Sequence, residues 1–447
     1  MRIHFISIGG SIMHSLAIEL KRNGHSISGS DDIIYEPAKS NLIKNNLLPN
    51  EEGWLIHRIT DDLDLVILGM HAKLDNPELL EAKRKNISIL SFPEFIYKYS
   101  QHKKRIVISG SHGKTSITAM IIHVLKLHRI KVDYLVGAQT DLIKNQVSLG
   151  NNKVIIIEGD EYLSSALDRR PKFMHYNPDI LVVSGVAWDH INVFPSLSSY
   201  QDAFKQIITQ TLSKNNKIFY CNEDNFLSHF LDKQDENTTP YSFPEYLIED
   251  NSCHILFNNC KIKLNIFGKH NLLNIEAAKN VCKELGVSEE YFYNGIQSFK
   301  GANRRLTLLK HINKHSSVYY DFAHSPSKVR ATIDAIKDIY SKRKLIACLE
   351  LHTFSSLNKK FLPNYHDIFL KCNHSLVYIS KNSLQDKYTN SIDAHFIRES
   401  FNDDSIVVIE DKKLLQKRLR SISFNNTNLL LMTSGNFSNL DLESLFN

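Results

Sequence analysis

A lysine and a threonine follow a glycine-rich turn near the first quarter of the chain, a combination suited to binding the phosphates of a nucleotide. Glycines allow the backbone to wrap an anion, a lysine ammonium reaches the β- and γ-phosphates, and a threonine hydroxyl ligates Mg²⁺. The spacing is unusual, since two residues separate Gly110 from Gly113 where the common motif has four. The residues assigned to the nucleotide here are Gly110, Ser111, His112, Gly113, Lys114, Thr115 and Ser116.

The segments on either side of this turn predict the elements that a phosphate-binding loop requires. Residues 105–108 form an apolar β-type run, and residues 117–128 form a helical run. A strand delivers the chain to the turn, and a helix N-terminus directs its N–H groups at the anion. Gly-Lys-Thr alone is a common tripeptide, but these flanks favour nucleotide binding over an ordinary strand–turn–helix.

Acidic and imidazole side chains follow three further predicted strands. Glu158 comes directly after one strand, Asp189 and His190 lie shortly after the next, and Asp321 and His324 follow a third. In open α/β sheets, ligands bind at the carboxyl ends of the strands, and carboxylates there hold Mg²⁺ directly or through water. Taken singly, each has a plainer alternative, such as a solvated acidic turn or a structural histidine.

Two other pairs carry polar groups suited to nucleotide recognition. Asn271 and Asn274 lie three positions apart at the start of a predicted helix, so they share a face. Their amides can contact a base, although Asn271 alone would also serve as a helix N-cap. Arg304 and Arg305 stand at a predicted domain junction, and arginine is suited to bidentate phosphate contacts. Surface charge is the alternative for this pair.

The order of strands and helices predicts an α/β chain with three units, covering residues 1–103, 104–299 and 300–447. Each unit alternates apolar strand runs with helical runs, which is typical of parallel sheets. Residues 232–239 are polar and are expected to form a loop inside the second unit.

Composition excludes several classes of protein. The chain has 447 residues, 42% hydrophobic and 23% charged, with a net charge of +6. That charge is too small and dispersed to indicate a nucleic-acid partner. No apolar run approaches the ~18 residues of a membrane span, and the start of the chain does not resemble a signal peptide. None of the six cysteines forms a CxxC pair, so we expect reduced thiols and a cytoplasmic protein.

The motifs together, in this order, resemble the Mur ligase family of ATP-dependent amide-forming enzymes that build peptidoglycan precursors. The resemblance spans the chain and implies three α/β domains: a Rossmann-like N-terminal domain for a UDP-sugar, a central P-loop ATPase-type domain, and a Rossmann-like C-terminal domain for the incoming amine. It also implies ATP and Mg²⁺ as cofactors.

The resemblance further implies roles for individual residues. Lys114, His190 and Arg304 would be catalytic, with Arg304 on the γ-phosphate. The metal would be bound by Thr115, Glu158 and His190. The remaining nucleotide contacts would come from Asn271 to adenine, its neighbour Asn274, and Asp321 to ribose. The residues implied for the substrates are Gly10, Ser11, Ser30 and Asp31 along the UDP-sugar, together with His324.

One stretch points to a particular reaction within the family. The acidic residues 158–162, followed by the basic residues 168–176, are similar to the member that joins UDP-N-acetylmuramate to the tripeptide L-Ala-γ-D-Glu-meso-diaminopimelate in peptidoglycan recycling. The resemblance implies these two molecules as substrates and an acyl phosphate as the intermediate. Two alternatives stay open: ligation of L-alanine to the same UDP-sugar, and a nucleotide-switched binding protein that ligates nothing.

Three positions depart from the family pattern. Ser7 stands where relatives commonly have glycine, Ser325 stands where many have a second histidine, and Trp188 occupies a position usually held by another residue type. The residues themselves indicate neither an oligomeric state nor whether the third residue of the acceptor is diaminopimelate or lysine.

Overall fold

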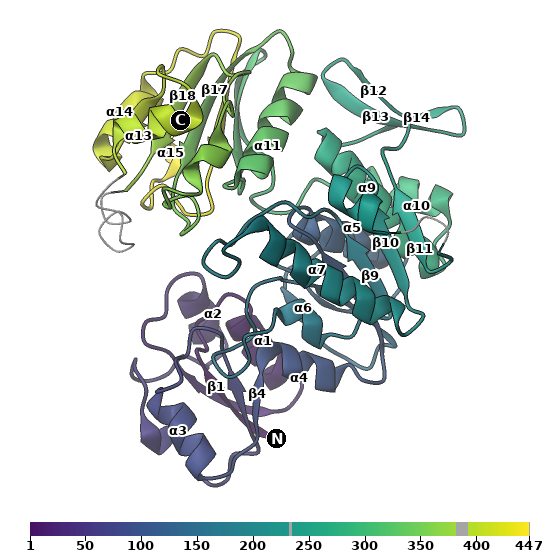
Figure 1. Ribbon diagram of the computed structural model, residues 1–447, viewed down its shortest axis with the longest axis vertical. Coiled ribbons are helices and arrows are strands. Elements are labelled where there is room, and N and C mark those ends of the chain that lie inside the picture. Colours follow the sequence, from purple (N-terminus) through teal and green to yellow (C-terminus); the bar gives the residue numbers. More distant parts are fainter. Residues whose placement is uncertain (232–234, 381–391, 447) are drawn as a thin grey trace.

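Four β-sheets organise the chain, which the computed structural model describes over residues 1–231, 235–380 and 392–446. Three of the sheets carry helices and correspond in order to the N-terminal, central and C-terminal parts of the chain (Figure 1). The N-terminal part lies at one end of the molecule and the C-terminal part at the other, with the central sheet between them. The predicted α/β fold class is therefore confirmed.

The N-terminal sheet has four parallel strands in the order β2-β1-β3-β4. Ile3 pairs with Ile27 on one side and Leu65 on the other, which places β1 at the centre. Apolar side chains on both faces of β1 and β3 are buried under helices, as a parallel sheet requires. Its elements are β1 (Arg2–Ile6), α1 (Met13–Arg22), β2 (Ser26–Ser30), α2 (Ala38–Lys44), the 3₁₀ turn η1 (Ile56–Arg58), β3 (Leu65–Leu68), α3 (Pro77–Arg84), β4 (Ile89–Ser91) and α4 (Phe92–Tyr99).

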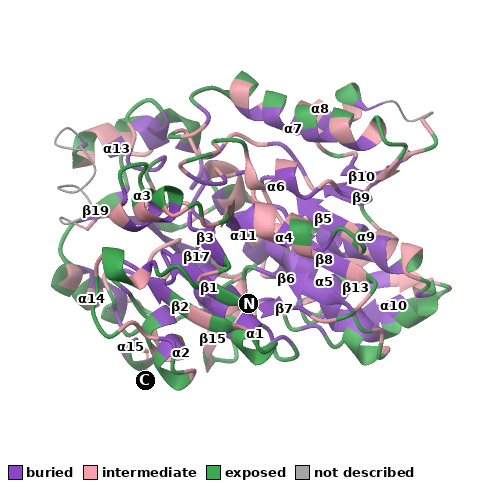
Figure 2. Cartoon of the chain, turned by 90° about the horizontal axis from the view of Figure 1, so that it is seen from below, coloured by how far each residue is buried: buried purple, intermediate pink, exposed green. Residues whose placement is uncertain are grey.

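The central sheet has seven strands in the order β11-β10-β9-β5-β8-β6-β7, and its core strands are buried (Figure 2). All neighbours are parallel except β6 and β7. The strand that leads into the glycine turn, β5, lies between β8 and β9, so their carboxyl ends meet at one edge. Its elements are β5 (Lys104–Ser109), α5 (Lys114–Leu127), β6 (Asp133–Leu135), β7 (Val147–Ser148), β8 (Val154–Glu158), α6 (Lys172–His175), β9 (Ile180–Val183), α7 (Leu197–Leu212), β10 (Lys217–Cys221), α8 (Asn225–Phe230), β11 (Thr238–Tyr241), α9 (Lys269–Glu284) and α10 (Glu289–Ile296).

The C-terminal sheet has six strands in the order β15-β16-β20-β17-β18-β19, all parallel except the β15–β16 pair. A separate three-stranded antiparallel sheet precedes α9 and projects beside it (Figure 1). The elements of these two sheets are β12 (Tyr246–Glu249), β13 (Ser252–Phe257), β14 (Cys260–Lys263), β15 (Thr307–Asn313), β16 (Ser316–Asp321), α11 (Pro326–Ile339), β17 (Lys344–Glu350), η2 (Leu362–Tyr365), β18 (His374–Tyr378), α13 (Ala394–Phe401), β19 (Val407–Ile409), α14 (Lys412–Arg420), β20 (Thr427–Met432) and α15 (Leu442–Leu445).

Two local predictions need correction. The loop expected over residues 232–239 gives way to β11 at Thr238, because this polar segment pairs in parallel with β10; residues 232–234 lie outside the described residues. Asn271 is not an N-cap, since α9 begins at Lys269 with Gly268 in the cap position.

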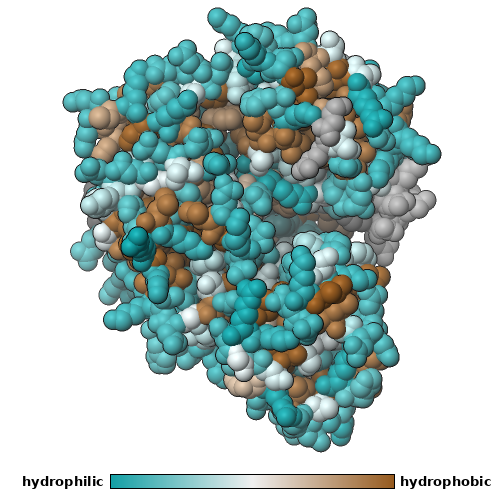
Figure 3. All heavy atoms as spheres, turned by 180° about the vertical axis from the view of Figure 1, so that it is seen from behind, coloured by the Kyte–Doolittle hydropathy of each residue, from teal (hydrophilic) through white to brown (hydrophobic). Residues whose placement is uncertain are grey.

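The outer surface is mostly hydrophilic on the face shown in Figure 3, with apolar patches between the polar side chains. No helix among the described residues is long and apolar enough to cross a membrane.

Candidate functional site

A cavity of about 290 Å³ lies where the central sheet meets the C-terminal part of the chain. Its walls come from the glycine turn, from the first turn of α9 and from the β16–α11 connection. The predicted site residues that line it are Ser111, His112, Gly113, Lys114, Thr115, Ser116, Glu158, His190, Asn271, Asn274, Asp321 and His324. Residues more than 200 positions apart in the sequence therefore meet in one cavity.

The glycine turn needs its two glycines for conformation and for space. Gly110 has φ of 125° and Gly113 has φ of 74°, in the region that other L-residues rarely adopt. A Cβ on Gly110 would lie 2.3 Å from the Ser184 hydroxyl oxygen, and one on Gly113 would lie 2.2 Å from Asn274 Oδ1. The turn can therefore approach its neighbours closely, and α5 begins directly after it at Lys114.

Lys114 is held by a buried acidic group that the sequence did not single out. Its Nζ donates to Gly110 O and to Glu161 Oε2, each at 2.6 Å. Glu161 also accepts a hydrogen bond from the Tyr200 hydroxyl at 2.9 Å and lies 3.5 Å from His190 Nε2. Burial alone would raise the pKa of Glu161, but the charges of Lys114 and His190 hold it well below its usual range. Lys114 and Glu161 are thus both ionised.

Thr115 and Glu158 form an oxygen-rich corner beside the lysine. Thr115 Oγ1 donates to Glu158 Oε1 at 2.7 Å, and the backbone N–H of Gly137 donates to Glu158 Oε2 at 2.6 Å. Carboxylate and hydroxyl oxygens are ligands that Mg²⁺ prefers, so these two residues fit the predicted metal. His190 lines the same cavity, but its imidazole faces Glu161. Burial would lower the pKa of His190, yet Glu161 and Asp189 raise it.

The structure separates the two neighbouring arginines. Arg304 has φ of 63°, and its guanidinium donates to the Tyr320 hydroxyl and to Gly435 O, away from the cavity lining. Arg305 lines the cavity instead; its Nη2 donates to Thr115 Oγ1 at 3.3 Å, and its guanidinium lies 4.5 Å from the centroid of the Phe322 ring. Of the two neighbouring arginines, Arg305 therefore lines the cavity and the predicted Arg304 does not.

A buried ion pair joins the central and C-terminal parts. Lys328 Nζ on α11 donates to Asp189 Oδ2 at 3.0 Å, and His324 Nε2 lies 3.9 Å from the same oxygen. Burial and the Lys328 charge lower the pKa of His324 to about 3. Its Nδ1 donates to Phe322 O at 2.8 Å. Because its pKa is low, the ring is neutral and a weak proton acceptor at neutral pH.

The predicted adenine and ribose contacts line the same cavity. Asn274 Nδ2 donates to Asn271 Oδ1 at 3.3 Å, while Asn271 Nδ2 donates to Phe267 O at 2.9 Å. Asp321 lies at the end of β16 and accepts a hydrogen bond from the Thr332 hydroxyl of α11. These side chains are buried and fixed by neighbours rather than free at the surface.

The predicted UDP-sugar residues lie in the N-terminal part, around the turn between β1 and α1. Asp31 Oδ2 accepts from the Gly9 N–H at 2.7 Å, which ties the end of β2 to this turn beside Gly10 and Ser11. Burial raises the pKa of Asp31 to about 6. Ser30 differs from the others, because its hydroxyl donates to the buried carboxylate of Glu78 and so turns into the domain interior.

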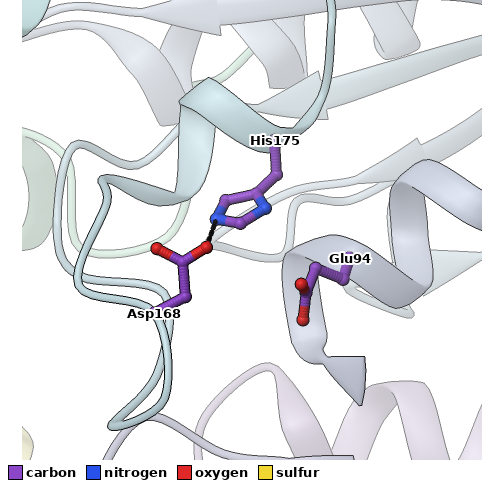
Figure 4. Close-up of side chains that lie close together, drawn as sticks. All are labelled: Glu94, Asp168 and His175. Atoms are coloured by element: carbon purple, nitrogen blue, oxygen red, sulfur yellow. Dashed lines mark ion pairs between the residues drawn. The ribbon is translucent and has the colours of Figure 1, made fainter. Parts of the chain in front are cut away.

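A second acidic cluster lies outside this site, where α4 meets the segment before α6. Figure 4 shows Glu94, Asp168 and His175 with their ligand atoms close together. Asp168 already accepts from the Arg170 guanidinium through both oxygens, at 2.6 to 3.1 Å. Glu94 Oε2 accepts from the Ser91 N–H and hydroxyl as part of the α4 capping box. The cluster is thereby explained as a contact between the N-terminal and central parts.

The fold has three α/β parts, and the cavity between the central and C-terminal parts brings together a glycine turn, a lysine, a threonine and a carboxylate. The Mur ligase family catalytic domain matches residues 2–104, and the Mur ligase middle domain matches residues 108–282. A UDP-N-acetylmuramate–L-alanine ligase from Clostridium botulinum is 32% identical over 387 residues, 83% of this chain and 80% of that one. The chain therefore belongs to the Mur ligase family, whose members are ATP-dependent ligases that form C–N bonds in peptidoglycan synthesis.

Solved structures share the three-domain fold. A murein peptide ligase from Psychrobacter arcticus has a TM-score of 0.68 at 23% identity and covers 100% of this chain and 99% of that one. A UDP-N-acetylmuramate–alanine ligase from Thermotoga maritima has a TM-score of 0.72 at 22% identity, covering 98% and 97%. These two relatives act on different amino components, so the fold alone does not select the acceptor.

Proposed function

We propose that this ligase activates the carboxylate of UDP-N-acetylmuramate with ATP and joins it to the tripeptide L-Ala-γ-D-Glu-meso-diaminopimelate. The observation that carries the proposal is the cavity in which Lys114, the Thr115–Glu158 corner and Arg305 face the β16–α11 connection. In this proposal the cations, the oxygens that would bind the metal and the acceptor domain are adjacent. A nucleotide switch that ligates nothing has no need for an acceptor domain.

The proposed chemistry follows from the weak electrophilicity of a carboxylate. Transfer of the γ-phosphoryl group of ATP to a carboxylate oxygen gives an acyl phosphate. The tripeptide's amine nitrogen then attacks the carbonyl carbon, a C–N bond forms, and inorganic phosphate leaves with the oxygen that came from the carboxylate. Lys114 and Arg305 stabilise the negative charge on the transferred group. Thr115 and Glu158 would bind Mg²⁺, which neutralises phosphate charge when it is present.

We propose that substrate binding breaks the Lys114–Glu161 contact in part. Lys114 donates to Gly110 O and Glu161 in this structure, and an arriving phosphate offers it an alternative acceptor. Glu161 would then keep its bonds with His190 and Tyr200 and hold the ammonium within reach of both positions. We place the γ-phosphate contact on Arg305, because Arg304 is engaged by Tyr320 and Gly435.

The remaining assignments extend to the other substrates. We propose that Asn271, Asn274 and Asp321 contact the nucleoside of ATP, since they line the cavity. The UDP-sugar would bind at Gly10, Ser11 and the Asp31-stabilised turn. Ser30 would support that turn from inside, because its backbone carbonyl accepts from the N–H groups of Ser7 and Ile8. We also propose that the reaction takes place in the cytoplasm, where ATP is available.

L-Alanine is the second candidate acceptor, because the C. botulinum relative is named for that amino acid. The acidic-then-basic residues 158–176 favour the tripeptide. The test is release of phosphate by purified protein with ATP, Mg²⁺ and UDP-N-acetylmuramate, adding either acceptor and identifying the product by mass. Tripeptide-dependent release with a ligated product supports the proposal. Release that requires L-alanine contradicts it, and release independent of any acceptor supports the nucleotide-switch alternative.

A further inference from the structure

A second cavity, of about 470 Å³, lies beside the first. Ala331 of α11 lines both cavities, so the helix stands between them. Ala187 and Trp188 of the central part line the second cavity, directly before Asp189 in the sequence. The second cavity therefore adjoins the first along α11.

One wall of this cavity is apolar and fixed in position. Trp188 Nε1 donates to Phe194 O at 2.9 Å, and the Trp188 ring meets Phe361 edge-to-face with centroids 5.4 Å apart. Trp188 belongs to the central part and Phe361 to the C-terminal part, so the wall requires both. This gives Trp188, an unexplained departure from the family pattern, a definite place in the structure.

The opposite wall carries charges of both signs on α11. Arg330 and Asp334 are four positions apart, which puts them on one face of the helix, and both line the cavity. Arg330 Nη2 donates to His366 O at 3.1 Å, and no carboxylate in the described part of the chain forms an ion pair with it. Asp334 Oδ1 accepts from Lys371 Nζ at 2.6 Å in a half-exposed pair. The cavity wall thus carries a guanidinium beside a carboxylate that is shared with Lys371.

We propose that this second cavity binds the distal end of the acceptor peptide, with Arg330 binding a carboxylate and Asp334 an ammonium. The inference rests on the proposed function, in which the acceptor is a tripeptide. The free end of meso-diaminopimelate carries an ammonium and a carboxylate on one carbon, which matches this pair of side chains. A lysine in the same position has the ammonium alone. Arg330 and Asp334 would therefore select diaminopimelate over lysine.

A tripeptide reaches farther from its reacting amine than a single amino acid does. Extended residues span about 3.5 Å each, so a tripeptide whose amine lies in the first cavity can extend roughly 10 Å beyond it. Free L-alanine has its carboxylate on the carbon that bears the reacting amine. It has no distal charged group that could bind in a neighbouring cavity.

The test compares two acceptors, L-Ala-γ-D-Glu-meso-diaminopimelate and L-Ala-γ-D-Glu-L-Lys, at saturating ATP and UDP-N-acetylmuramate. The variants are Arg330→Met, Arg330→Lys and Asp334→Asn, with Asp338→Asn as the matched control on the same helix. We expect Arg330→Met to raise KM for the diaminopimelate peptide on the order of tenfold, with kcat and the KM for ATP little changed. Arg330→Met should raise KM for the lysine peptide by less than about threefold, because that peptide lacks the distal carboxylate.

The conservative variant and the control sharpen the result. Arg330→Lys should recover part of the affinity, and Asp338→Asn should behave as the wild type. If Arg330→Met leaves the ratio of the two KM values unchanged while the protein remains folded and binds ATP normally, the assignment of this cavity is overturned. If the wild-type enzyme ligates L-alanine and neither peptide, the proposed function itself fails, which is a separate outcome.

Discussion

The ammonium of Lys114 lies 2.6 Å from the buried carboxylate of Glu161, within a group that also includes His190 and Tyr200. This pair keeps a lysine charged in a site where burial would otherwise lower its pKa. It also fixes the ammonium at the mouth of the glycine turn before any phosphate arrives. The pair therefore links the fold of the central sheet to the phosphoryl transfer proposed above.

Removing the ammonium should strongly lower turnover without unfolding the protein. We expect Lys114→Met to lower acceptor-dependent phosphate release by about a thousandfold, because the charge on the transferred group loses its main protein cation. Glu161→Gln should have a smaller effect, since the ammonium stays but is less firmly placed. Phosphate release and nucleotide binding by fluorescence titration check both variants. Normal turnover by Lys114→Met would show that the turn does not act on the phosphates.

The two neighbouring arginines should have unequal effects. Arg305→Met is expected to lower kcat by about a hundredfold, because its guanidinium lines the cavity and reaches Thr115. Arg304→Met should lower kcat far less and reduce the melting temperature instead, since its guanidinium ties Tyr320 to the loop at Gly435. Steady-state kinetics and thermal denaturation of both variants distinguish the roles. If Arg304→Met lowers kcat more than Arg305→Met does, the phosphate contact belongs to Arg304.

The position of the Glu158 carboxylate depends on the absence of a side chain at Gly137. A Cβ on Gly137 would lie 2.9 Å from both carboxylate oxygens of Glu158. We expect Gly137→Ala to displace that carboxylate and to raise the Mg²⁺ concentration for half-maximal activity by about tenfold. Gly150→Ala is the matched control, because its Cβ would find no atom closer than 3.6 Å. Equal Mg²⁺ dependence of activity in the two variants would show that Glu158 does not bind the metal.

The network around Gly137 also reaches the N-terminal domain. Gln146 Nε2 donates to Gly137 O at 2.9 Å, and Gln146 Oε1 accepts from the Ser15 hydroxyl on α1 at 3.1 Å. The segment that holds Glu158 is thus hydrogen-bonded to the helix that follows the proposed UDP-sugar turn.

Binding of the UDP-sugar should depend on pH through Asp31. Burial raises the pKa of its carboxyl to about 6, so the group is neutral below that pH and negative above it. The negative form lies beside the turn proposed to bind a diphosphate. We therefore expect KM for UDP-N-acetylmuramate to rise about fivefold as pH increases through 6. Asp31→Asn, which cannot ionise, should flatten that part of the profile, and parallel profiles for the two proteins would contradict this role.

The sequence predicted the elements of the fold well because their signals are local. Apolar runs marked β5, β8 and β9, and the chemistry-bearing residues that follow them met at one sheet edge as expected. Which arginine turns inward could not be predicted, because it depends on the left-handed backbone at Arg304, which no local pattern encodes.

Other parts of the site depend on contacts between distant residues. Ser30 was expected to face the UDP-sugar, but Glu78, 48 positions later, accepts its hydroxyl inside the domain. In the sequence, Glu161 is one of several acidic residues after β8 and nothing distinguishes it. Its position as the partner of the Lys114 ammonium is apparent only in the structure, where Tyr200 and His190 also contact it. The second cavity is lined by residues from two domains, so no single stretch of sequence predicts it.

The most direct test of the account follows the oxygen that the proposed acyl phosphate would transfer. UDP-N-acetylmuramate labelled with ¹⁸O in its carboxylate is incubated with the enzyme, ATP, Mg²⁺ and L-Ala-γ-D-Glu-meso-diaminopimelate. We predict that the ligated UDP-muramyl tripeptide forms and that each released phosphate from fully labelled substrate carries one ¹⁸O atom. Phosphate free of ¹⁸O, or release without the ligated tripeptide, would contradict it.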